Sequence, residues 1–226
     1  MAEDFFINKA SIAIDCTAIF FLGGLIYYTT AFRRRGRLSD RFYFLILVTD
    51  IVAAIFDIMV DFFEFQPVRF QTTFMMLGST VFSSAVICLG FLFMLYVLTF
   101  TDYGEARIVA RWKYWFIPAV IAMVVLIINI FTGWVTYVDP KDHQYYHGAF
   151  YYVAFVPLVV YLIVIIKCLW KFNRPAMFVL IALIVGRLIM EALFMSVSST
   201  AFFVAVILTY LHVDVMNDEF NTEVSK

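Results

Sequence analysis

The chain has 226 residues, of which 64% are hydrophobic and 15% are charged, and its mean hydropathy is +0.93. Soluble domains carry roughly 45–50% apolar and about 25% charged residues, so this composition excludes an ordinary soluble protein. The net charge of −1 provides no basic field that would attract nucleic acid. We therefore expect an integral membrane protein that contacts the lipid bilayer.

Apolar runs between polar breakers predict seven transmembrane helices, because the hydrocarbon core of a bilayer requires roughly 20 apolar residues per helix. The predicted spans are 9–32, 42–63, 73–99, 114–132, 149–171, 175–195 and 199–215. The last two are divided at "SVSST", since one helix over 175–215 would be about twice as long as the hydrocarbon is thick. The expected fold is thus an all-α seven-helix bundle, with a loop over 133–148 and a short tail over 216–226.

The distribution of basic residues predicts an outside N-terminus and a cytoplasmic C-terminus, because short cytoplasmic loops are enriched in Lys and Arg. The first, third and fifth loops and the tail hold Arg33, Arg34, Arg35, Arg37, Arg41, Arg107, Arg111, Lys113, Lys167, Lys171, Arg174 and Lys226. The other side holds Lys9, Arg69 and Lys141. The acidic N-terminus lacks signal-peptide features, so we expect the first span to remain as a signal anchor in the plasma or inner membrane.

A row of carboxylates lies in the second predicted span, "TDIVAAIFDIMVDFFEF". Asp50, Asp57, Asp61 and Glu64 fall within an arc of roughly 60° on a helix that turns about 100° per residue. A carboxylate in hydrocarbon costs several kcal/mol unless it is paired, protonated or hydrated. This face is therefore expected to point into the bundle, although Asp61 and Glu64 are close enough to the outer interface to reach water.

Other polar residues fall at similar depths in the outer half of the predicted bundle. They form a candidate ligand-binding layer of Asp15, Asp57, Arg187, Glu191, Ser79, Ser83 and Asn129, with Asp50 and Asp61 as a candidate proton or ion relay. Carboxylates outnumber the single embedded cation, Arg187, which predicts protonation or a cationic ligand. The alternative is that the charged residues only fix the register of the helices.

The sequence contains no motif that is typical of an enzyme or of a cofactor site. His143 and His147 fall in the predicted outer loop, the three cysteines have no metal-ligand spacing, and the last span lacks the lysine that a retinal protein needs. No nucleophile–base pair or phosphate-binding glycine loop is present. We expect neither an enzyme nor a bound metal or cofactor.

The polar end of the chain, "VDVMNDEFN", continues the last predicted span with Val213, Met216 and Phe220 at helical spacing. Together with the seven spans and short loops, it resembles the N-terminal membrane sensor modules of bacterial diguanylate cyclases and histidine kinases. This resemblance implies signalling through the last helix into a cytoplasmic output domain. Since no GGDEF-type or kinase domain follows Lys226, we expect an isolated sensor module or part of a longer protein.

The resulting functional expectation is a membrane receptor or sensor that binds a small ligand, a cation or a proton, in an outward-facing polar pocket. Its expected partners are a small molecule, a cytoplasmic signalling protein and a second copy of the chain, without nucleic acid. The alternative is a secondary or proton-coupled transporter that uses the same carboxylates. A third possibility is a structural membrane subunit in which the buried charges have no role in function.

Overall fold

Four helices in the computed structural model are long and apolar enough to cross a membrane. They are α1 (Ala2–Phe32), α2 (Leu38–Glu64), α3 (Gln71–Leu98) and α4 (Glu105–Thr132), with candidate spans Ala10–Ala31, Leu38–Phe63, Gln71–Leu98 and Ala106–Thr132. The structure describes residues 2–32, 38–64, 71–100, 105–139, 145–172, 174–194, 203–207, 209–210 and 213. The predictions of a helical architecture and a multi-pass membrane protein are confirmed.

Shorter elements follow α4. The strands β1 (Thr136–Val138) and β2 (Tyr145–His147) form an antiparallel hairpin that pairs Tyr137 with Tyr146. The helices α5 (Tyr151–Ala154), α6 (Val156–Phe172) and α7 (Arg174–Phe194) come next, and residues 203–207 and 209–210 are also helical. The predicted loop over 133–148 therefore contains a hairpin, whose strands "TYV" and "YYH" consist largely of β-branched and aromatic residues.

The prediction of seven spans is wrong in number, and the fifth predicted span, 149–171, shows one cause. A turn at Phe155 divides this segment into α5 and α6, and α6 has 17 residues. Pro157 explains the division, because a proline has no N–H group to bond the carbonyl four residues earlier and is tolerated only in the first turn of a helix, where α6 places it. The segment is therefore not one continuous membrane helix.

The sixth and seventh predicted spans also fall short among the described residues. In α7 the apolar stretch among the described side chains is Pro175–Gly186, which is shorter than a span, and the side chains of Arg187 and Glu191 lie outside the described residues. Of the segment 199–215 only 203–207, 209–210 and 213 are described, and the tail 216–226 lies outside the described residues.

The helix α4 begins earlier than the predicted span 114–132. Its first turns are formed by "EARIVARWK", which was expected to be a loop. Here Ile108 is buried while Arg107 and Arg111 are exposed, so the segment is an amphipathic extension of the helix. The spans predicted at 9–32, 42–63 and 73–99 correspond to α1, α2 and α3.

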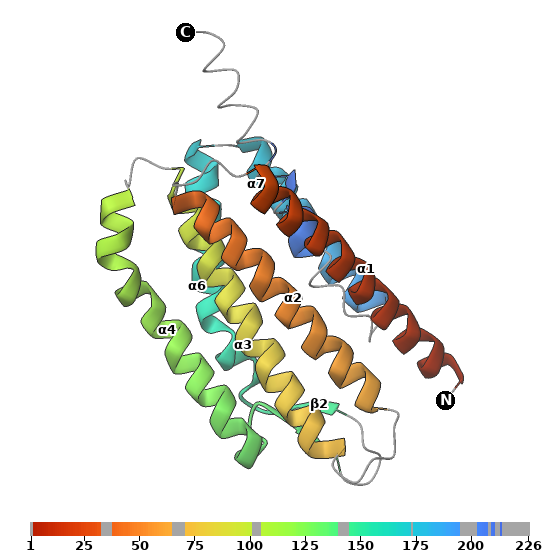
Figure 1. The fold of residues 1–226 in the computed structure, drawn as a ribbon. Coiled ribbons are helices and arrows are strands. Elements are labelled where there is room, and N and C mark those ends of the chain that lie inside the picture. Colours follow the sequence, from red (N-terminus) through yellow and green to blue (C-terminus); the bar gives the residue numbers. More distant parts are fainter. Residues whose placement is uncertain are drawn as a thin grey trace, which may run out of the picture.

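The helix α3 is at the centre of the bundle, where it packs against α2, α4 and α6 (Figure 1). The helix α1 lies at one side, and its main contact among the described elements is α2. On the other side the Tyr161 hydroxyl of α6 donates a 2.8 Å hydrogen bond to the backbone carbonyl of Trp115. This bond fastens α6 to α4 one turn before Pro118, which lies inside α4.

Asn129 and Gly148 fix the turn and hairpin that follow α4. The Asn129 Nδ2 donates to the carbonyl and hydroxyl oxygens of Thr136 at 3.0 and 2.9 Å. Its Oδ1 accepts from the backbone N–H groups of Val135 and Thr136 at 2.6 and 3.2 Å. At Gly148 an added Cβ would overlap the Trp134 carbonyl group, at 2.6 Å from its carbon. The hairpin is thus held tightly against the end of α4.

Replacement of Gly148 by Ala should destabilise this hairpin, because the methyl group would have to displace backbone atoms of Trp134. We expect Gly148→Ala to lower the free energy of unfolding by about 2 kcal/mol or more. Thermal unfolding of the detergent-solubilised protein measures this. The matched control is Gly23→Ala on α1, where a Cβ meets nothing within 4 Å and the stability should not fall. Equal stability of the two variants would contradict the close contact.

The fold and the basic residues together predict which loops face the cytoplasm. Successive long helices run in opposite directions, so the C-terminal ends of α1 and α3 and the N-terminal ends of α2 and α4 lie at one end of the bundle (Figure 1). Reporter fusions in the loops 33–37 and 101–104 should be cytoplasmic, and fusions in 65–70 and 140–144 should be outside, because the first set is flanked by basic residues. A fusion at residue 173 should also be cytoplasmic if α5 and α6 together cross the membrane. If the reporter at 173 were found outside, α5 and α6 would not cross the membrane and α6 would lie at its outer surface.

Candidate functional site

Carboxyl groups from α1 and α2 gather at the interface between these helices. Asp15 of α1 and Asp50 of α2 are both 0% exposed, Asp57 is also buried, and Asp61 is half-buried. Asp15 lies within electrostatic range of all three α2 residues, in addition to being buried. We call Asp15, Asp50, Asp57 and Asp61 the carboxylate cluster.

The buried face of α1 explains the position of Asp15. Ser11, Asp15, Ala18 and Leu22 recur every three or four residues and are all 0% exposed, whereas Phe20, one position beyond the partly buried Ile19, is 83% exposed. This spacing follows one stripe along a helix. Asp15 is therefore on the side of α1 that packs against α2, and it cannot reach lipid.

Two contacts orient α2 around the carboxylate cluster. Ala54 packs with Ala18 of α1. On another side, Met59 and Val60 contact α3 so closely that a Cβ on Gly78 would lie 2.8 Å from each side chain. On a helix that turns about 100° per residue, the aspartates of α2 fall between these two directions. They therefore follow the line where α1, α2 and α3 meet, as the arc of carboxylates in the sequence predicts.

Hydrogen bonding distinguishes Asp15 and Asp50 from the rest of the cluster. Neither oxygen of either side chain has a hydrogen-bond partner within the part of the chain that the structure describes. Asp57 and Asp61 take part in further polar or electrostatic interactions. An ionised carboxylate in such surroundings costs several kcal/mol, and a neutral carboxyl group costs much less. The site is consequently suited to hold protons or to accept a positive charge.

The spacing of the acidic side chains favours protons over a metal ion. Among the described residues, no three His, Cys, Asp or Glu side chains converge closely enough to hold a metal. Calcium needs six to eight oxygen ligands around one point, whereas a proton binds to a single carboxyl group. The carboxylate cluster is therefore spread along the helix interface and has no common centre.

The other predicted site residues are placed differently. Ser79 and Ser83 are buried on α3, the helix that packs against α2. Asn129 uses its whole amide group to fix the turn after α4, so we assign it a structural role. Arg187 and Glu191 lie on α7, but their side chains are outside the described part of the structure. The structure thus brings together the aspartates of the predicted site.

Two cavities bounded by described residues contain none of the predicted site residues. One is a groove of about 430 Å³ between α2, α3 and α4, where Val52, Cys88 and Trp112 are among its walls. The other is an apolar cavity that reaches from α2 and α3 to α7. Neither cavity was predicted from the sequence, because each depends on how the side chains of several helices pack together. The polar pocket of the sequence analysis stays a prediction.

Comparison with models of protein families, with curated proteins and with solved structures finds no match for this chain.

Proposed function

We propose that this membrane protein is a receptor-like sensor that binds protons, or a small cation, at the carboxylate cluster between α1 and α2. The observation that supports this function is the pair Asp15 and Asp50, which are completely buried and have no hydrogen-bond partner among the described residues. Asp57 and Asp61 add further acidic groups within electrostatic range of Asp15. Four carboxyl groups at one helix interface make its charge depend on what they bind.

A change in the charge of the cluster would act on the packing of α1. Neutral carboxyl groups allow α1 and α2 to stay in contact, while two or more negative charges between them repel one another. The helix α1 has its main described contact with α2, whereas α2 also packs on α3. We therefore assign the movement to α1, relative to a frame made by α2 and α3.

The movement of α1 would reach an output through the last helix, by analogy with the bacterial sensor modules that the sequence resembles. In such modules the last membrane helix continues into a cytoplasmic output domain. Here the corresponding segment would run from the helical residues 203–207 towards "VDVMNDEFN". A cytoplasmic partner or a second copy of the chain would then receive the signal. If the sensor binds a small ligand instead of a proton, we expect that ligand to contact Arg187 and Glu191 of α7 as well as the aspartates.

A proton-coupled transporter is the second candidate, and the position of Asp50 favours it. Asp50 lies on α2 two turns from Asp57 towards the end with the basic loops, and it is completely buried. Buried carboxyl groups at successive depths are typical of proton relays in membrane carriers. In this alternative, Asp57 and Asp61 would receive a proton from outside and Asp50 would pass it inwards.

The stability of the protein should depend on pH through Asp15. The folded bundle accommodates a neutral Asp15 better than an ionised one, while the unfolded chain exposes the same group to solvent. The wild-type protein should therefore lose stability as the pH is raised from about 5 to about 8, with a slope of up to about 1.4 kcal/mol per pH unit for each proton involved. Asp15→Asn should reduce this slope, as measured by thermal unfolding in detergent. Asp40→Asn, at the start of α2, is the control that should keep it.

An unchanged slope in Asp15→Asn would show that Asp15 does not bind the proton. In that case the carboxylate cluster serves helix packing alone and the proposed function is wrong.

Movement of α1 and proton transport can be separated in one set of lipid vesicles. Cys16 is an exposed free cysteine beside Asp15, so a fluorophore attached to it reports on α1. In a sensor, its emission should change with external pH in the wild type but not in Asp15→Asn, without proton uptake above that of protein-free vesicles. In a transporter, a dye inside the vesicles should record proton uptake that Asp50→Asn abolishes. A constant emission from the labelled wild type would contradict the proposed movement of α1.

A further inference from the structure

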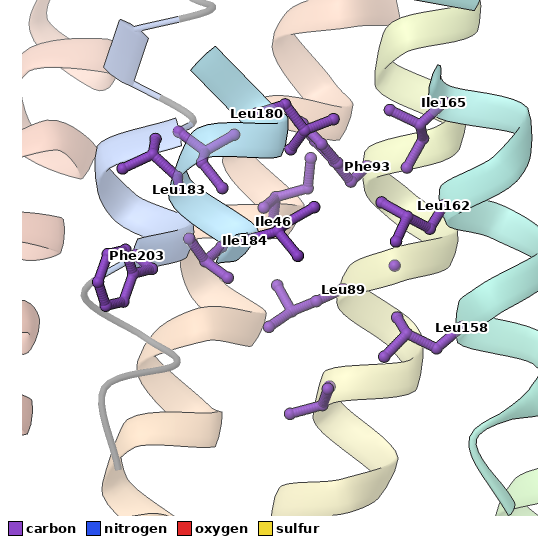
Figure 2. Close-up of a pocket in the computed structure, with 14 residues that line it drawn as sticks. Ile46, Leu89, Phe93, Leu158, Leu162, Ile165, Leu180, Leu183, Ile184 and Phe203 are labelled. Carbon is purple, nitrogen blue, oxygen red and sulfur yellow. The ribbon is translucent and has the colours of Figure 1, made fainter. Parts of the chain in front are cut away.

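An apolar cavity of about 190 Å³ lies where α2, α3 and α6 meet the C-terminal helices. Side chains from α2, α3, α6, α7 and residues 203–207 point towards this common space (Figure 2). The walls include Ile46, Leu89, Leu162, Leu180, Ile184 and Phe203. The carboxylate cluster does not contribute to them, so this cavity is separate from the proposed proton site.

The chemistry of the walls determines what the cavity can hold. All the described residues that line it are apolar, and their side chains contain only carbon (Figure 2). A water molecule inside a protein needs two to four polar partners, and these walls offer none from side chains. A protein cavity of roughly 150 Å³ with similar Leu, Ile and Phe walls stays dry and binds benzene. Protein interiors contain few voids larger than a water molecule, so a space of this size is suited to a hydrocarbon guest.

Access to the cavity is possible from the outer faces of α6 and α7. Leu162 and Ile184 in the walls are only half-buried, so the cavity is not sealed on this side. Their neighbours Ile163 and Val185 point outwards and are 48% and 46% exposed. Exposed aliphatic side chains of this kind are compatible with contact to lipid chains, where hydrocarbon is abundant. A guest that entered between α6 and α7 would pass along these apolar side chains.

We infer that this cavity is a binding site for a hydrocarbon group, either a small apolar molecule or the end of a lipid acyl chain. The guest would contact α3 and α6 on one side and α7 with residues 203–207 on the other. It would therefore stabilise the packing of the C-terminal helices on the rest of the bundle. This inference does not depend on the proton site or on the proposed function.

Thermal unfolding with benzene as the probe tests the free-molecule form of the site. Benzene should raise the Tm of the purified wild-type protein by a few degrees, since a ligand that binds the folded state stabilises it by mass action. Leu162→Phe, which fills the cavity, should lose this shift. Its matched control, Ile163→Phe, places the same ring on the outer face of α6 and should keep the shift. Any effect of benzene on the detergent itself would be equal in both variants.

Native mass spectrometry tests the lipid form of the site. If the guest is an acyl chain, the wild type and Ile163→Phe should retain one lipid that Leu162→Phe has lost. A second pair, Ile184→Phe with Val185→Phe as control, tests the opposite wall and replaces the first pair if Leu162→Phe fails to fold. Loss of the benzene shift in the filled variants supports a small apolar guest, and loss of the lipid supports an acyl chain. If filled and control variants behave alike in both experiments, the inference is wrong.

Discussion

In hydrocarbon a polar group finds no water to bond, and the described structure depends on this constraint. The backbone satisfies it by forming helices, whose hydrogen bonds are made within each segment. Asn129 satisfies it with four hydrogen bonds to the turn after α4. Asp15 and Asp50 are the exceptions, because they are buried away from lipid but have no hydrogen-bond partner among the described residues. At Asp15 and Asp50 burial therefore keeps the carboxyl groups away from lipid without supplying a hydrogen bond.

The carboxylate cluster and the apolar cavity are both formed on one central frame of helices, one by acidic and the other by apolar side chains. The helix α3 packs against α2, α4 and α6 and gives the bundle its core. On one side of this frame α2 carries the carboxylate row and receives α1 through contacts such as Ala18 with Ala54. The same frame provides the apolar walls of the cavity, where α3 and α6 face α7. The helix α1 is therefore joined to the frame across the carboxylate cluster, and α7 across the apolar cavity.

The sequence predicted the inward carboxylate row because charge in an apolar helix is costly and its spacing along the helix is regular. It also indicated Asp15, although the direct approach of Asp15 to the row depends on how α1 packs against α2. The hairpin after α4 was missed, since strands of three residues give little periodic signal. The division at Phe155 was missed because hydropathy alone does not account for the effect of Pro157. The apolar cavity could not be predicted, as it results from imperfect packing between helices that are far apart in sequence.

The burial of Asp15 against α2 also has a consequence for how the protein is made. During synthesis α1 emerges before α2, and an aspartate in a lone membrane helix costs up to about 2.5–3.5 kcal/mol, the value at the helix centre. The cost falls when α2 covers this side chain, as it does in the folded bundle, where Asp15 is 0% exposed. Entry of the first two helices as a pair is therefore more favourable than entry one at a time.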